Sequence, residues 1–129
     1  MVGGIASKRT ILVVDDDSDI RRIVRDFLQG CGHEVVLAES GEVALETFKL
    51  YRPAVRAVLT DIMMGVMSGI DLADHLHQIS PTLPIVFMSG YIQDGQLGGC
   101  TVLRKPFRLA ELKQAIETAL RSGQQHSDT

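Results

Sequence analysis

Short apolar runs alternate along the chain with longer stretches in which apolar residues recur every three or four positions. The run Thr10–Val14 is continuous and rich in β-branched side chains, which is typical of a strand that is covered on both faces. Similar runs occur at residues 34–38, 55–60, 84–88 and 101–103. The pattern therefore predicts five strands.

The stretches between these runs predict helices. After the first run, the apolar residues between positions 20 and 28 recur at helical spacing. Asp17 or Ser18 is the candidate N-cap of this helix, and Gly30 or Gly32 marks its end. Further helices are predicted from residue 40 to near 53, from 68 to 79 behind an S-x-x-D capping pattern, and from 109 to about 121.

Strict alternation of strands and helices predicts an α/β fold with a parallel sheet, helices on both faces and right-handed crossovers. The flavodoxin-like, doubly wound five-stranded sheet of order 2-1-3-4-5 fits this length best. One connection departs from the pattern: only eleven residues separate Ser89 from Thr101, and four of them are glycines. We therefore predict that the fourth helix is very short or absent.

At 129 residues, the chain has the size of one domain. We expect an N-terminal tail at 1–8, the domain at 9–121 and a disordered polar tail at 122–129. No apolar run approaches the roughly 18 residues of a membrane span, and no secretory signal precedes the first strand, so we expect a cytoplasmic protein without membrane insertion. A net charge of −3 argues against direct nucleic-acid binding. Oligomeric state is left open.

Polar residues follow four of the predicted strands. Asp15, Asp16 and the candidate cap Asp17 come after the first strand and Asp61 ends the third, while Ser89 and Lys105 follow the last two. Each alone is ordinarily a turn, cap or surface residue. The carboxyl ends of parallel strands meet at one sheet edge, where several carboxylates repel one another unless a cation is present. Mg²⁺ suits such oxygen ligands.

Five blocks of the sequence resemble the signature blocks of response-regulator receiver domains, and the resemblance covers about residues 9–121. The blocks are Ile11–Asp17, Leu59–Met64, Met67–Gly69, Met88–Gly90 and Arg104–Phe107. The resemblance implies a two-component phosphorelay module that takes a phosphoryl group from a phosphohistidine. Its partner would be a histidine kinase or a histidine phosphotransfer domain.

The resemblance also implies roles for individual residues. Asp61 corresponds to the phosphoacceptor. Asp15 and Asp16 correspond to the acidic pair that binds Mg²⁺ together with Asp61, with Asp16 as the direct ligand and Asp15 acting through water. The backbone carbonyl of Met63 would be a further metal ligand.

Two more residues would hold the phosphoryl group, the Ser89 hydroxyl and the Lys105 ammonium. The bond before Pro106 is expected to be cis, as is usual in the family. Val102 replaces the aromatic residue that often precedes the lysine, so we expect no aromatic switch there. The run Ser89–Tyr91 resembles receivers that are fused to hybrid histidine kinases.

Two other functions stay open. A pseudo-receiver would be an interaction module that is not phosphorylated. A haloacid-dehalogenase-like phosphatase would use Asp15 and Asp17 in a D-x-D-x-[ST] motif, but Asp19 stands where the hydroxyl residue is required. We expect no turnover enzyme: a receiver catalyses only its own phosphorylation and dephosphorylation.

Overall fold

All five predicted strands are present in the computed structural model, which describes residues 10–90, 96–97 and 100–127. The central strand β1 (Thr10–Val14) pairs in parallel with β2 (Glu34–Ala38) on one side and β3 (Val55–Asp61) on the other. Beyond β3, the sheet continues in parallel through β4 (Ile85–Ser89) and β6 (Cys100–Arg104). The predicted order 2-1-3-4-5 is confirmed for these five strands.

A sixth strand, β5 (Gln96–Leu97), was not predicted. It runs antiparallel to β6 and pairs Gln96 with Thr101 and Leu97 with Cys100 at the sheet edge. Two glycines stand between the paired residues in the sequence, and glycines predict only that a helix is unfavourable there. Because 96–97 form a strand, no three-turn helix fits between β4 and β6. The prediction of a short or absent fourth helix is confirmed.

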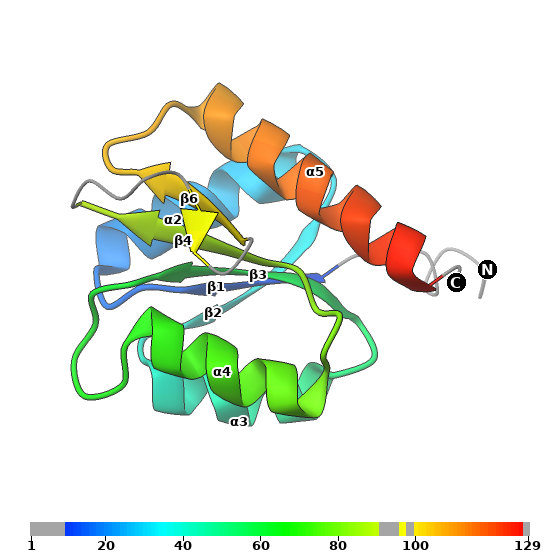
Figure 1. Cartoon of the computed structure of the whole chain (residues 1–129). Helices are drawn as coiled ribbons and strands as arrows, with labels where there is room; N and C mark the ends of the chain where they lie inside the picture. Colours follow the sequence, from blue (N-terminus) through cyan, green and yellow to red (C-terminus); the bar gives the residue numbers. More distant parts are fainter. Residues whose placement is uncertain (1–9, 91–95, 98–99, 128–129) are drawn as a thin grey trace.

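Within the described residues, four helices cover the sheet (Figure 1), α2 and α5 on one face and α3 and α4 on the other. Side chains of β1 alternate between the two faces. Ile11 and Val13 pack in the layer under α2 and α5, while Leu12 and Val14 pack in the layer under α3 and α4. The bounds are α2 Ser18–Gly30, α3 Gly41–Tyr51, α4 Gly69–Ile79 and α5 Leu109–Ser127.

The helix starts follow the capping signals of the sequence. Asp17 is the N-cap of α2, and its carboxylate accepts a hydrogen bond of 2.9 Å from the Asp19 amide. Ser68 and Asp71 form a complete capping box at the start of α4. At the end of α2, Gly32 adopts a φ of 98°, in the left-handed region that glycine tolerates best.

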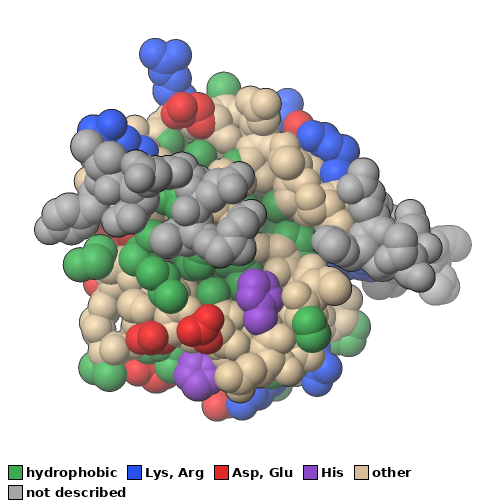
Figure 2. Space-filling model, viewed as in Figure 1, with side chains coloured by type: hydrophobic (Ala, Val, Ile, Leu, Met, Phe, Trp, Pro, Cys, Tyr) green, Lys and Arg blue, Asp and Glu red, His purple; other side chains and the backbone are tan. Residues whose placement is uncertain are grey.

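The last helix is longer than predicted, because α5 continues to Ser127, into the tail that we expected to be disordered. The sequence contains no proline after Pro106 that would end the helix. The polar residues Gln124 and Gln125 are also good helix formers. None of the helices in the described part of the chain is long and apolar enough to cross a membrane. On the face that carries α4, acidic and histidine side chains lie among hydrophobic ones (Figure 2), a mixed surface with no large basic patch among its described residues.

Candidate functional site

The sheet order brings two acidic strand ends together. β1 and β3 are hydrogen-bonded neighbours, with Val14 opposite Thr60, so Asp15 and Asp61 follow at the same edge. Asp15 is fully buried and Asp61 is only 6% exposed, whereas Asp16 is exposed. Carboxylate oxygens of the three residues all lie within 4.8 Å of one another. The predicted acidic triad is therefore assembled.

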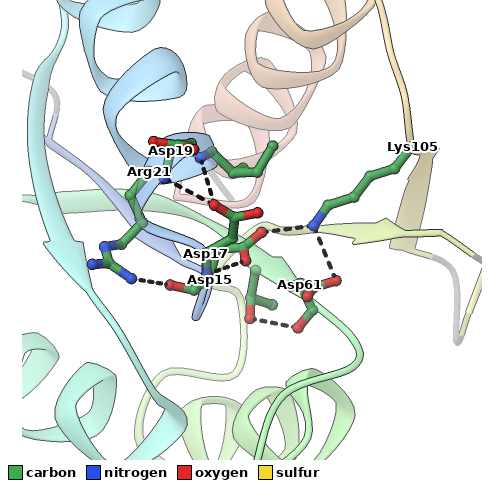
Figure 3. A network of polar contacts seen from close by, with 8 residues as sticks. Asp15, Asp17, Asp19, Arg21, Asp61 and Lys105 are labelled. Atoms are coloured by element: carbon green, nitrogen blue, oxygen red, sulfur yellow. Dashed lines mark hydrogen bonds and ion pairs between the residues drawn. The ribbon is translucent and has the colours of Figure 1, made fainter.

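Lys105 reaches this triad from the end of β6 (Figure 3). Its Nζ lies 2.8 Å from Asp15 Oδ2 and 3.6 Å from Asp61 Oδ1. Burial lowers the pKa of Lys105, but the hydrogen bond and charge of Asp15 and the charge of Asp61 outweigh it, so the pKa is raised overall. The lysine therefore stays protonated at neutral pH. The bond before Pro106 is cis, as expected.

Ser89 ends the strand next to β3 and is 1% exposed. Met88 is the register partner of Asp61, so Ser89 lies one residue beyond the acceptor on the neighbouring strand. The Lys105 amide donates a 2.7 Å hydrogen bond to the Ser89 carbonyl. The two residues that were expected to hold a phosphoryl group are thus joined through their backbones.

The Asp61 carboxyl group has a raised pKa. Desolvation by burial is the main cause and the nearby Asp15 charge adds to it, while Lys105 and a hydrogen bond from the Met63 amide act in the opposite direction. The Lys105 ammonium and the Met63 amide thus only partly offset burial and the neighbouring carboxylates. An additional cation is the natural relief, and three carboxylates supply the hard oxygen ligands that Mg²⁺ prefers.

The start of α4 packs against the backbone of Asp61. A Cβ atom added to Gly69 would overlap the carbonyl oxygen of Asp61 and lie 2.9 Å from its carbonyl carbon. The Gly69 amide donates to the Ile62 carbonyl at 2.9 Å, and the Thr60 hydroxyl donates to the Asp61 carbonyl at 3.0 Å. Gly69 therefore has a positioning role that the spacing of the sequence did not reveal, although it stands in one of the five recognised blocks.

Comparison with known proteins identifies this arrangement. The sequence profile described as the response regulator receiver domain matches residues 11–117. The chain belongs to this family.

Two curated relatives are about a third identical to this receiver domain over the residues that align. The response regulator receiver protein CpdR of Brucella abortus is 34% identical over 118 residues, which are 87% of this chain and 97% of CpdR. The 3',5'-cyclic-nucleotide phosphodiesterase regA of Dictyostelium discoideum is 35% identical over 125 residues, 90% of this chain but only 16% of regA. The receiver domain thus spans a small part of some relatives and nearly all of others.

A solved structure shows the same fold. The receiver domain of the hybrid histidine kinase CckA is 28% identical, has a TM-score of 0.77, and is matched over 86% of this chain and 98% of that one. In the present receiver domain the structure places Asp15, Asp16, Asp61 and Lys105 together and Ser89 beside them. The expected metal contact of the Met63 carbonyl stays a prediction.

Proposed function

We propose that this receiver domain accepts a phosphoryl group on Asp61 from the phosphohistidine of a histidine kinase or histidine phosphotransfer domain. The observation that carries the proposal is the environment of the Asp61 carboxylate. It is buried at the centre of the sheet edge, within 4.8 Å of the Asp15 and Asp16 oxygens, with the Lys105 ammonium 3.6 Å away. A nucleophile, a cation site and a fixed positive charge are the elements that phosphoryl transfer to a carboxylate requires.

Asp15, Asp16 and Asp61 would hold one Mg²⁺, with the Met63 carbonyl as a further ligand. When bound, this ion neutralises the carboxylates and the charge of the transferred phosphoryl group. Mg²⁺ keeps several waters in most protein sites, and phosphoryl oxygens can replace them. The raised pKa of Asp61 fits a site whose acidic groups are incompletely neutralised by the protein alone.

Transfer begins with the ionised Asp61 carboxylate. One of its oxygens attacks the phosphorus atom, the bond between phosphorus and the donor imidazole breaks, and the imidazole nitrogen keeps the electron pair. Lys105 forms an ion pair with the phosphoryl oxygens, and the Ser89 hydroxyl donates a hydrogen bond to them. Reversal with water in place of imidazole releases phosphate, so we propose that the domain catalyses only its own modification and is not a turnover enzyme.

Incubation with acetyl phosphate, with and without Mg²⁺, tests the acceptor. We expect the added phosphoryl mass in the wild-type domain only with Mg²⁺, and no addition in Asp61→Asn. Asp17→Asn is the matched control: it makes the same chemical change two residues beyond Asp15, outside the triad, and asparagine still caps a helix. Absence of label in the wild type would favour a pseudo-receiver. Label that persists in Asp61→Asn but is lost in Asp15→Asn would favour the phosphatase-like chemistry.

The phosphodonor protein has a candidate docking surface beside Asp61. An apolar hollow lies between the start of α2 and the loop after β6, and Lys105 lines both this hollow and the acidic site. Ile23 is 51% exposed and Leu109 is 42% exposed, an arrangement typical of a surface that a partner covers. The residues that line it are Ile20, Ile23, Val24, Lys105, Pro106, Phe107 and Leu109.

Replacement of Ile23 by serine separates docking from chemistry. We expect Ile23→Ser to slow labelling by a purified histidine kinase that labels the wild type by about tenfold, because buried apolar contact is lost. Labelling by acetyl phosphate, which needs no docking, should be unchanged. Leu50→Ser is the control, since Leu50 is 79% exposed on α3, on the opposite face of the sheet. If Ile23→Ser slowed labelling by the kinase and labelling by acetyl phosphate equally, the proposed docking surface would be contradicted.

A further inference from the structure

Every hydrogen-bonding group of Asp15 is engaged. Its amide donates to the Ala38 carbonyl at 3.2 Å, and its two carboxylate oxygens accept from the Asp17 amide at 2.9 Å and from Lys105 at 2.8 Å. The remaining group, the main-chain carbonyl, accepts a 2.6 Å hydrogen bond from Arg21 Nη1 (Figure 3). Charge-assisted bonds of this length are among the stronger protein hydrogen bonds.

Arg21 differs from the other two arginines of α2. Arg22 pairs with Asp19 at 2.8 Å and Arg25 pairs with Asp26 at 3.1 Å, and in both pairs the side chains are substantially exposed. Exposed pairs of this kind contribute little to stability. Arg21 is partly buried and reaches back six residues to the backbone at the end of β1. Its contact joins the helix to the acidic site.

The Asp15 carbonyl belongs to the same planar peptide unit as the amide and Cα of Asp16. A bond that fixes this oxygen therefore fixes the point from which the Asp16 side chain starts. Asp16 has no other anchor that we observe: within the described ranges, no hydrogen bond or ion pair to its carboxylate is found, and the side chain is exposed. The direction of Asp16 thus depends on its backbone.

We propose that Arg21 is a positioning residue that holds the Asp15–Asp16 peptide so that the Asp16 carboxylate stays directed at the cation position of the triad. This role rests on the proposed Mg²⁺ site and adds to it a residue that touches neither the cation nor the phosphoryl group. Partners that orient metal ligands typically change metal affinity by about 10- to 100-fold when they are removed.

The test is a calorimetric Mg²⁺ titration of the whole domain, without any phosphodonor. In Arg21→Met, which keeps the unbranched stem but removes the donor, we expect the dissociation constant to rise about tenfold. Arg22→Met is the matched control, one residue away on the same helix, and should bind Mg²⁺ like the wild type. In acetyl phosphate labelling, the Mg²⁺ concentration for half-maximal rate should rise by the same factor, while the rate at saturating Mg²⁺ stays within about twofold.

The outcomes are distinguishable from those for the proposed function. A wild-type domain that binds Mg²⁺ but takes no label refutes phosphorylation of Asp61 and leaves the role of Arg21 measurable. Unchanged affinity in a folded Arg21→Met overturns only the role of Arg21, and a wild type that does not bind Mg²⁺ overturns both. If Arg21→Met does not fold, Arg21→Gln, whose amide is too short for the contact, replaces it. Failure of both to fold would show a purely structural role and overturn the proposal.

Discussion

The two connections that flank β4 are built in opposite ways. The segment from β3 to α4 is fixed at both ends: the Ile62 amide donates to the Met88 carbonyl at 2.9 Å, the Gly69 amide donates to Ile62, and a capping box closes the helix start. Between β4 and β6, the described residues include a two-residue strand and no helix. The first connection touches the acceptor through Gly69, whereas the β5 strand of the second lies at the sheet edge, separated from β3 by β4 and β6. We therefore expect the geometry to be tightly constrained at Asp61 and less constrained at this edge.

The largest effect should come from Gly69→Ala, because the added Cβ overlaps backbone atoms of Asp61 that cannot move aside like a flexible side chain. We expect a loss of about 3 kcal/mol in the free energy of unfolding, at the upper end of overpacking effects. Displacement of the acceptor should also slow acetyl phosphate labelling by about a hundredfold. Urea unfolding and mass spectrometry measure the two effects.

Gly65→Ala in the same loop is the control for this change. A Cβ at Gly65 meets no atom within 4 Å and its φ is not in the left-handed region. Alanine should therefore be neutral or stabilise by about 0.5 kcal/mol, through the lower entropy of the unfolded chain. A destabilisation as large as that of Gly69→Ala would show that the backbone geometry of the whole loop is tightly constrained, and not only its contact with Asp61.

Asp61→Asn should stabilise the metal-free domain, whereas Gly69→Ala destabilises it. The pKa of Asp61 in the folded state is raised above the ordinary 3.8, mainly by burial and then by Asp15. As pH rises above 3.8, the unfolded chain releases this proton first, so the folded state loses stability until the pH passes the raised pKa. Asp61→Asn removes this loss. We expect its free energy of unfolding at pH 7 to be about 1 kcal/mol higher than that of the wild type, a typical gain where a strained functional site is relieved.

Thermal melting in EDTA at pH 7 and at pH 3.5 measures this difference. The gain of Asp61→Asn should be largest at pH 7 and small at pH 3.5, just below the ordinary pKa of 3.8, where the wild-type carboxyl group is mostly protonated in both states. Asp17→Asn, outside the triad, should show no such gain. A lower melting temperature for Asp61→Asn at pH 7 would refute the view that the carboxylates destabilise the metal-free site.

The smallest effect on labelling belongs to β6, the strand that the second connection joins to β4. Val102 on β6 pairs with Phe87 and packs, partly buried, against the core under α3 and α4. Val102→Ala should cost about 1 kcal/mol in unfolding and leave acetyl phosphate labelling within about twofold. A large loss of labelling would show that this edge of the sheet does control the acceptor, and the contrast between the two connections would fail.

Most of the site residues could be predicted from the sequence because the ends of the strands can be recognised in it. Buried apolar runs that stop before polar residues, together with the parallel order, place Asp15, Asp61, Ser89 and Lys105 at one edge, and the receiver resemblance supplied their individual roles. The N-caps Asp17 and Ser68 were predicted because capping is local: a side chain bonds an amide two or three residues away.

What the sequence did not reveal depends on distances across the fold. Arg21 is one of three arginines on α2, and nothing in its spacing distinguishes the one that reaches the Asp15 carbonyl. The same holds for Gly69, whose need to be glycine comes from an approach to Asp61 eight residues earlier. The β5 pairing was missed because two residues are too few for a periodic signal, and the length of α5 was misjudged because polar residues were taken as a sign of disorder.

The hydrogen bond from the Lys105 amide to the Ser89 carbonyl makes two strand ends into one mechanical unit. The backbone pairing of β4 and β6 therefore extends to these two residues, so the main-chain positions that carry the hydroxyl and the ammonium are held at a fixed spacing beside Asp61. Because this spacing comes from pairing between the strands, it does not require a helix in the connection that joins them.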